Sequence, residues 1–411
     1  MSQVTPSSGR PDLRIVSPCD KETCSGEVVA VETEYSTEIF VRCAPLRGEA
    51  AELDFEGQVR RFYNCLPRLL SRGGGDWKDV VLERAFFHDF DRDWETLRRV
   101  RQEAYACGDV AAGDLPALTC IRQPPCHQPQ KVELQVYAVV PKEPESVTVQ
   151  TRVDPKTRAT IKLVTIGGRR HLYIADIQGI DRTSSTAIGF REQSDRMFAN
   201  AAKLLEPFGI KFTEVLRTWC YLKEIDDDYA EFNLSRNAFF AEQGVTRLPA
   251  STGIRAGLWP DQALCGMDLY ALLDTQGVGI QVMHTPTLNE ADEYGSSFSR
   301  GMKIDLPEKT VLHISGTASI DESGQTVHVG DAKKQLERML LNVRELLQHQ
   351  GASFEDVTQI ATFLKQAEDY ELCQQLLRQW GIRHVPNTLV EAGVCRPELL
   401  CEMEAIAILP K

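Results

Sequence analysis

The apolar positions of the chain follow a helical period in three stretches that share the same polar residues. Each stretch carries Gln, then Arg three residues later and Asn about one turn further on, between apolar positions spaced by three and four. This spacing predicts three amphipathic helices, each packed against a sheet. The polar residues are Gln58, Arg61 and Asn64; Gln193, Arg196 and Asn200; and Gln335, Arg338 and Asn342.

The elements around each of these helices also recur in the same order. A strand-like segment follows each helix, then a second helix rich in Asp and Glu, a proline-led strand and a final apolar strand. The repeat predicts an α+β protein of three tandem units, each a mixed β-sheet backed by two α-helices. We place unit 1 at residues 25–142, unit 2 at 158–285 and unit 3 at 294–411, and we expect the polar, proline-containing residues 140–160 to be a linker.

Composition narrows the classes of function. The length of 411 residues suggests more than one domain, and the net charge of -13 argues against a general nucleic-acid binder. The twelve cysteines have no metal-binding spacing, so we expect neither a metal nor a cofactor. No apolar run approaches the roughly 20 residues of a membrane span, and the first residues lack the apolar core of a signal peptide. We therefore expect a cytoplasmic protein without a membrane partner.

The repeat resembles the RidA superfamily, most closely in unit 3 from "LHISGTASI" to "EMEAIAI". That family folds as a mixed sheet with two helices and forms trimers with sites in the clefts between subunits. The resemblance implies that three units in one chain make an intrachain pseudo-trimer, either monomeric or assembled into a larger homo-oligomer.

A narrower resemblance runs from about residue 160 to the C-terminus. The motifs "RTWCYLKEI", "FNLSRNAFF", "YGSSFSRG", "SGTASI" and "VCRPELLCEME" are similar to those of the chorismatases, which cleave chorismate to pyruvate and a hydroxylated ring acid. The resemblance implies a small, anionic, chorismate-like substrate and no cofactor. In this chain an additional, degenerate RidA-like unit precedes the two that resemble a chorismatase.

The last predicted strand carries two carboxylates, Glu402 and Glu404, on one face. Unit 3 alone has this pair, which suggests one working site per chain. By resemblance Glu402 is the catalytic acid, with its pKa raised by burial and with Glu404 as a supporting group. The alternative is a structural glutamate bound by backbone donors or by an Arg. The equivalent positions are Glu133 and Gln135 in unit 1, and Gly266 and Asp268 in unit 2.

A substrate with two carboxylates needs cationic partners, which Arg supplies best. The candidates on matching motifs are Arg236, Arg300 and, more weakly, Arg396, and Tyr229 lies two helical turns before Arg236. Each Arg could instead form a surface or interdomain ion pair. By resemblance, Cys395 and Gly301 also line the substrate pocket, and this combination favours 3-hydroxybenzoate as the product.

Two other functions remain open. The chain could be a RidA-type ligand-binding or regulatory protein that has no catalytic activity. It could also be an imine deaminase, although those enzymes carry an Arg two residues after the proline of the penultimate strand. Here that position holds Leu118, Ser251 and Thr388 in the three units, which argues against a deaminase.

Overall fold

The computed structural model describes residues 13–16, 25–44, 48, 52–180, 187–290 and 297–411. Its helices are α1 (Phe55–Arg72), α2 (Phe90–Cys107), α3 (Phe190–Leu205), α4 (Ile225–Gln243), α5 (Ala332–Gln348) and α6 (Tyr370–Gln379). No helix of the described residues is long and apolar enough to cross a membrane. Residues 294–296, at the start of the expected unit 3, lie outside the described residues.

The strands of the described residues form three sheets. In spatial order, the first contains β1 (Leu13–Val16), β2 (Ser25–Glu32), β3 (Ser36–Ala44), β6 (Val132–Pro141), β4 (Val80–Phe87), β5 (Ala117–Arg122) and β12 (Gly257–Leu258). The second contains β11 (Ala250–Arg255), β10 (Val215–Leu222), β13 (Cys265–Leu272), β9 (Arg169–Gln178), β8 (Thr160–Ile166) and β7 (Val147–Val153). The third contains β14 (Gly279–Val282), β15 (Gly301–Asp305), β16 (Lys309–Ala318), β19 (Cys401–Pro410), β17 (Val357–Leu364) and β18 (Asn387–Glu391).

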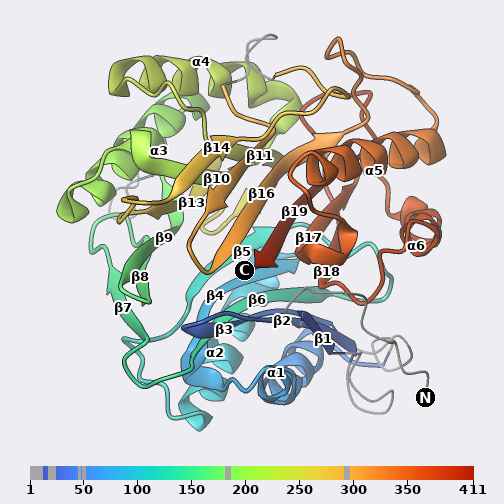
Figure 1. The fold of residues 1–411 in the computed structure, drawn as a ribbon. Coiled ribbons are helices and arrows are strands. Elements are labelled where there is room, and N and C mark those ends of the chain that lie inside the picture. Colours follow the sequence, from blue (N-terminus) through green and yellow to red (C-terminus); the bar gives the residue numbers. More distant parts are fainter. Residues whose placement is uncertain (1–12, 17–24, 45–47, 49–51, 181–186, 291–296) are drawn as a thin grey trace.

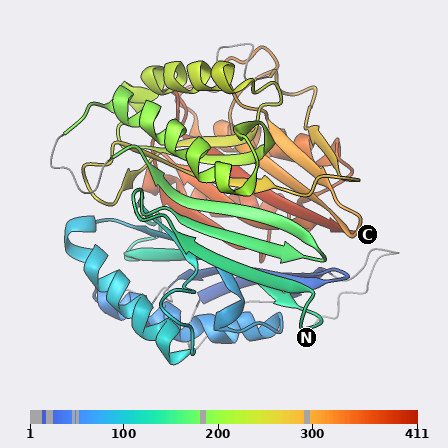
Figure 2. The same cartoon turned by 90° about the vertical axis from the view of Figure 1, so that its left-hand side faces the viewer.

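The three sheets share one topology. Each has one parallel pair, β4 with β5, β10 with β11 and β17 with β18, and its other pairs are antiparallel. The final strand of each unit, β6, β13 or β19, lies inside its sheet. In Figures 1 and 2 the helices lie on the outside of the molecule and the three sheets face one another. The prediction of an α+β fold with three repeated units is confirmed.

The repeated glutamines have a structural role that explains their spacing. Gln335 is buried, its side-chain amide donates to the Glu398 carbonyl (2.9 Å) and its carbonyl accepts from the Leu400 N–H (2.8 Å). Gln58 and Gln193 make the same pair of bonds to the chain just before β6 and β13. Each glutamine therefore fixes the start of the last strand to the first helix.

The repeated asparagines have the same role in units 2 and 3 but not in unit 1. Asn200 and Asn342 donate to backbone carbonyls at the ends of β9 and β16. Asn64 is exposed instead, so its assignment to the repeat was wrong. It lies six residues after its glutamine, whereas the other two lie seven, and this one-residue difference turns it away from the sheet.

The segments expected to join the units also contribute strands. β7 lies within the expected linker 140–160 and pairs antiparallel with β8, so this linker contains a strand of the second sheet. β14, placed in unit 2 by the boundary at 285, pairs with β15 in the third sheet. β12 of unit 2 pairs with β5 of unit 1. The alternation of apolar and polar residues within a segment does not show which strand that segment pairs with. These strands pair in hairpins or with another unit, so the sequence did not predict the pairings.

Candidate active site

Glu402 lies on β19 where unit 3 meets unit 2. Its carboxylate occupies the space beside Gly316, since a Cβ on Gly316 would lie 1.9 Å from Glu402 Oε1. The Gly316 N–H donates to Thr252 Oγ1 of unit 2 (3.0 Å), which fixes the boundary between the two units here. Among the described residues, no hydrogen bond to the Glu402 carboxylate is found. The chain therefore holds a carboxylate, 4% exposed, at the boundary between units 2 and 3, with no donor among the residues that the structure describes.

Burial raises the pKa of Glu402 to about 8. The negative charge of Glu404 acts in the same direction, while the guanidinium groups of Arg217 and Arg300 lower this pKa. Desolvation is the largest of these effects because water is excluded on all sides of the strand. At neutral pH the carboxyl group is therefore mainly protonated and can donate a proton.

Glu404 is held by side chains from the two other units. It accepts hydrogen bonds from Arg217 Nη2 (2.7 Å) and Trp219 Nε1 (3.1 Å) on β10, and from Arg84 Nη1 (3.3 Å) on β4. These three donors fix the carboxylate at the point where all three units meet. Glu404 is therefore placed to hold Arg217 beside Glu402, as expected for a supporting group.

The positions equivalent to Glu402 differ in the other two clefts. Glu133 accepts two bonds from Arg42, at 2.6 and 3.2 Å. Arg42, on β3, pairs with Gln135, whereas the register of β16 against β19 shifts between Ile314 and Thr317, the stretch that contains Gly316. Gly266 has no side chain, and Leu258 fills its cleft, 2.2 Å from where a Cβ would lie. Of these three positions, Glu402 alone presents a carboxyl group without an ion-pair partner within hydrogen-bonding distance, which favours one working site.

Arg236, on α4, is buried beside this cleft with little compensation for its charge. It is 3% exposed, donates from Nη2 to Asn233 Oδ1 (2.5 Å), and its Nε has no hydrogen-bond partner. Its guanidinium lies over the Phe232 ring (5.0 Å) and the Phe298 ring (5.7 Å). A buried guanidinium with an unused donor is suited to an anionic ligand.

Tyr229 and Cys395 lie together in the cleft. The Tyr229 hydroxyl contacts the Cys395 thiol, and Tyr229 stacks on Phe232 with centroids 6.3 Å apart. Burial, and then the charge of Glu402, raise the pKa of Cys395 to about 12. The cysteine is therefore a thiol at neutral pH and lines the site without being a nucleophile.

Arg300 reaches the same cleft from the segment before β15. It is 2% exposed and donates to Asn289 through Nε (2.7 Å, to the backbone carbonyl) and Nη2 (3.1 Å, to Oδ1). Its guanidinium lies 5.6 Å from the centroid of Phe298, the ring that Arg236 also contacts. Arg236 and Arg300 are thus brought together around one aromatic ring.

Gly301 and Arg396 are placed differently from the other predicted residues. A Cβ on Gly301 would lie 2.7 Å from Met283 Sδ and 2.9 Å from the His313 carbonyl, so close packing requires glycine there. Arg396 Nη1 donates to the Gly324 carbonyl (2.8 Å) in the loop after β16. The charge of Arg396 lowers the pKa of Cys395, and its bonds to Gly324 and Thr326 hold this loop in place.

Arg217 belongs to the site, although the sequence did not single it out. It is 2% exposed, Nη2 donates to Thr252 Oγ1 (2.6 Å) as well as to Glu404, and Nη1 has no hydrogen-bond partner. Burial lowers its pKa to about 10, so it is still charged at neutral pH. The available signal was a charged residue inside "VLRTWCYL", a strand in which every residue is buried.

Comparisons with known proteins agree with this architecture. The family model described as Endoribonuclease L-PSP matches residues 295–409. The 3-aminoacrylate deaminase RutC of Acinetobacter baylyi is 31% identical over 98 residues, covering 24% of this chain and 78% of that protein. A RutC family protein of Pyrococcus abyssi is 32% identical over 98 residues, covering 23% of this chain and 76% of that protein.

A solved structure is similar over a longer part of the chain. The crystal structure of a chorismatase superposes with a TM-score of 0.60 at 18% identity and covers 81% of this chain and 94% of that one. This coverage exceeds units 2 and 3 together, so part of the chain before unit 2 also matches that fold. At this level of identity the similarity is one of fold.

Proposed function

Because the chain belongs to the RidA superfamily, through its Endoribonuclease L-PSP unit, and has a chorismatase-like fold, we propose that it is a chorismatase-type enzyme. The reaction is cleavage of the enolpyruvyl ether of chorismate to pyruvate and a hydroxylated ring acid. The observation that carries this proposal is the buried Glu402 carboxyl, without a hydrogen-bond donor and with a pKa of about 8. The proposal assigns no metal or cofactor to the reaction.

The first step requires an acid that is protonated at neutral pH. Glu402 donates its proton to the terminal methylene carbon of the enolpyruvyl group, which becomes a methyl group, and the ether carbon becomes an oxocarbenium ion. A water molecule or a substrate hydroxyl adds to that carbon and loses its proton, which returns to the Glu402 carboxylate. If water adds, the hemiketal breaks at the ether bond into pyruvate and a dihydroxycyclohexadiene acid, which becomes 3-hydroxybenzoate by losing one water as the ring aromatises. If the substrate hydroxyl adds, the cyclic ketal breaks at the ether bond and also at the bond between that hydroxyl oxygen and the ring; pyruvate leaves with this oxygen, and the ring loses a proton and aromatises to 3-hydroxybenzoate.

Three buried guanidinium groups provide the binding partners for two carboxylates. Arg236 and Arg300 share the Phe298 ring, and Arg217 has an unused donor between Glu404 and Glu402. The bound substrate is an anion, whereas positive charge develops on the ether carbon in the transition state. Positive groups beside Glu402 therefore stabilise the bound substrate more than the transition state, and they act mainly in binding. We propose Tyr229 and Cys395 as further contacts of the substrate.

The proposed product depends on which residues line the substrate site. Cys395 lies in it beside Tyr229, in agreement with the resemblance that favours 3-hydroxybenzoate. Gly301 packs against Met283, so its contribution would be indirect, through the position of Arg300. We therefore propose 3-hydroxybenzoate as the product on the basis of Cys395.

Imine deamination is the second candidate, favoured by the similarity to RutC. The Glu402 cleft has Ser251 where deaminases of this superfamily carry Arg. Ser251 accepts from Thr218 Oγ1 (2.9 Å) and bonds Ser315 through its N–H (2.9 Å), so it closes the interunit boundary. A deaminase would have to bind its substrate through Arg217 instead.

The test is turnover of chorismate by the purified full-length chain. We expect pyruvate and one aromatic product, measured by a coupled pyruvate assay and by chromatography. Glu402→Gln should lower kcat by roughly 10²–10⁴-fold, because the acid is lost while shape is kept. Glu398→Gln, an exposed glutamate four residues away, is the matched control and should leave kcat unchanged.

Three outcomes distinguish the candidates. Turnover of an amino-acid-derived imine, with none of chorismate, would identify a deaminase. Chorismate binding without turnover, equal in wild type and Glu402→Gln, would identify a non-catalytic binding protein. Undiminished turnover by Glu402→Gln would overturn the assignment of the acid.

A further inference from the structure

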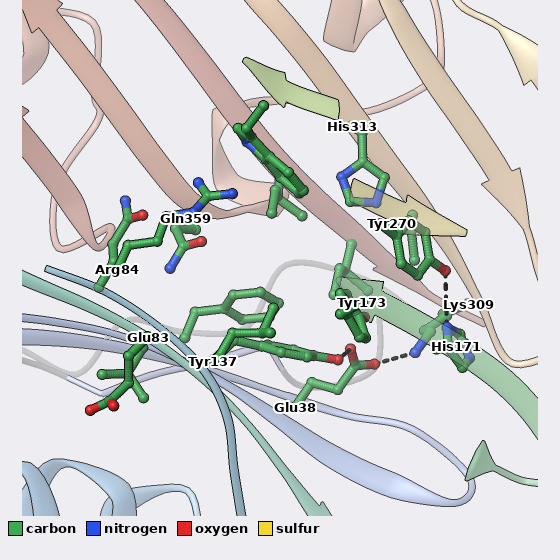
Figure 3. Close-up of a pocket in the computed structure, with 18 residues that line it drawn as sticks. Glu38, Glu83, Arg84, Tyr137, His171, Tyr173, Tyr270, Lys309, His313 and Gln359 are labelled. Atoms are coloured by element: carbon green, nitrogen blue, oxygen red, sulfur yellow. Dashed lines mark hydrogen bonds and ion pairs between the residues drawn. The ribbon is translucent and has the colours of Figure 1, made fainter. Parts of the chain in front are cut away.

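A second cavity lies at the centre of the molecule, where the three sheets face one another. Three equivalent strands from each unit line it: β3, β4 and β6; β9, β10 and β13; and β16, β17 and β19. It holds about 670 Å³ of space, including its opening to solvent. Figure 3 shows side chains from all three units converging on it. A mainly apolar and aromatic lining with a few polar groups is typical of small-molecule sites.

Much of the wall is aromatic. The Tyr173 ring stacks on Tyr270 with centroids 4.9 Å apart and lies 5.9 Å from Tyr137, which in turn contacts Phe40 at 5.1 Å. Such faces favour a flat aromatic ring, which can pack against them in stacked or edge-on geometry.

Two buried imidazoles in this wall have a ring nitrogen without a partner. His171 is 4% exposed; its Nδ1 lies 2.9 Å from the Tyr270 hydroxyl, and its Nε2 has no hydrogen-bond partner. His313 is 7% exposed, and its Nδ1 has no partner. Burial lowers the pKa of both to about 3, so both rings are neutral. A buried polar atom without a partner is costly, and a bound hydroxyl or water removes that cost.

The charged side chains of the wall already have partners. Lys309 pairs with Glu38, which also accepts from the Tyr137 hydroxyl (2.6 Å), as Figure 3 shows. Arg84 binds Glu404 (3.3 Å), and Glu83 binds Arg101 (2.5 Å). An ionic ligand would therefore enter without a counter-charge, and its desolvation would not be compensated.

The three units contribute different residues at equivalent places. Phe40, Tyr173 and His313 each face the matching residue of the last strand of their own sheet, which is Tyr137, Tyr270 or Ile406. A trimer of identical chains would present one residue three times. Here the divergence of the repeat makes the cavity asymmetric, with its polar nitrogens on units 2 and 3.

We propose that this central cavity is a binding site for a neutral aromatic molecule that carries a hydroxyl group, that is, a phenol-type ligand. The ring packs on the tyrosines, and the hydroxyl bonds the free nitrogen of His171 or His313. A hydroxyl both donates and accepts, so it suits either tautomer of a neutral imidazole. This site is separate from the Glu402 cleft and does not depend on the proposed reaction.

The test uses 4-fluorophenol as the probe and follows its fluorine NMR signal with the full-length chain. We expect saturable binding in the millimolar range, tighter than that of fluorobenzene, which lacks the hydroxyl. Val311→Phe fills the cavity and should weaken binding at least about tenfold. Val329→Phe, the same change at a side chain that is 65% exposed, should leave binding unchanged. Ile408→Phe, also on the cavity wall, is a second filling variant if Val311→Phe does not fold.

The Glu402→Gln variant locates the bound probe. Unchanged binding in this variant, together with loss in a cavity-filling variant, supports the central site. Loss in Glu402→Gln with retention in both filling variants would place the probe in the Glu402 cleft and overturn the proposal. Absence of saturation would show that the cavity takes water only, and equal affinity for fluorobenzene would overturn the role of the imidazoles.

Discussion

The Gly316→Ala substitution should lower the activity of this protein without preventing its folding. The added methyl carbon would lie 1.9 Å from Oε1 of Glu402 and 2.8 Å from its Cδ. The nearest other atom, Thr252 Cγ2, would be 3.1 Å away, which is tight but tolerable. The clash therefore falls on the end of one flexible side chain, and we expect the chain to fold.

The distance by which the Glu402 carboxylate must move determines how far kcat falls. Real Cβ contacts stay above about 3 Å, so the Glu402 carboxylate must move by roughly 1 Å from its place in the cleft. A misplacement of this size costs a rate factor of about 10², or roughly 2.7 kcal/mol in the barrier. We therefore expect kcat for chorismate to fall about a hundredfold.

The assay is pyruvate release under saturating chorismate, with the melting temperature measured on the same samples. Gly113→Ala is the control, because a Cβ there meets no atom within 4 Å. It should leave kcat unchanged. A Gly316→Ala protein that keeps the wild-type kcat would show that the position of the Glu402 carboxylate does not determine the rate.

Three further predictions concern charge and the repeat. The value of kcat/KM should be constant below pH 8 and fall about tenfold per pH unit above it, since Glu402 must be protonated. The free energy of unfolding of the wild type should fall relative to that of Glu402→Gln as the pH rises from 4.5 to about 8, because the pKa of Glu402 is higher in the folded state than in the unfolded state. Glu404→Gln leaves the buried Arg217 without its counter-charge and Arg84 with Asp268 alone, 3.8 Å away, and should destabilise by about 3–5 kcal/mol in denaturant unfolding. Stability equal to that of Glu402→Gln would contradict this. Gln335→Ala removes the acceptor of the Leu400 N–H and should cost about 1–3 kcal/mol, against no change for the exposed Gln348→Ala.

The repeat was readable from the sequence because it rests on local periodicity. The buried glutamines at 58, 193 and 335 recur with their helices, and each makes the same contact with the chain before the last strand of its own unit. Glu402 was also readable, because unit 3 alone has a pair of glutamates in its last strand, where the other units have Glu133 with Gln135 and Gly266 with Asp268. Arg236 and Arg300 followed from their motifs, and the structure brings both to Phe298.

Other features depend on which segments meet in space. Arg217 of unit 2 and Arg84 of unit 1 bind Glu404 of unit 3 across sequence separations of 187 and 320 residues, which no local pattern encodes. The pairing of Glu133 with Arg42 likewise appears only when β3 lies beside β6. Strand β12, which leaves unit 2 to pair with unit 1, is a further case.

The sequence by itself determined the elements, their threefold repetition and the one unit that has a pair of glutamates in its last strand, because helix period, strand alternation and burial preference are properties of neighbouring residues. The tertiary structure alone decided what surrounds Glu402. Glu133 is paired with Arg42 of its own unit, whereas the pKa of Glu402 depends on its burial and on charges that include Arg217 of unit 2. The same holds for the central cavity, whose two free imidazole nitrogens are a consequence of three diverged sheets facing one another.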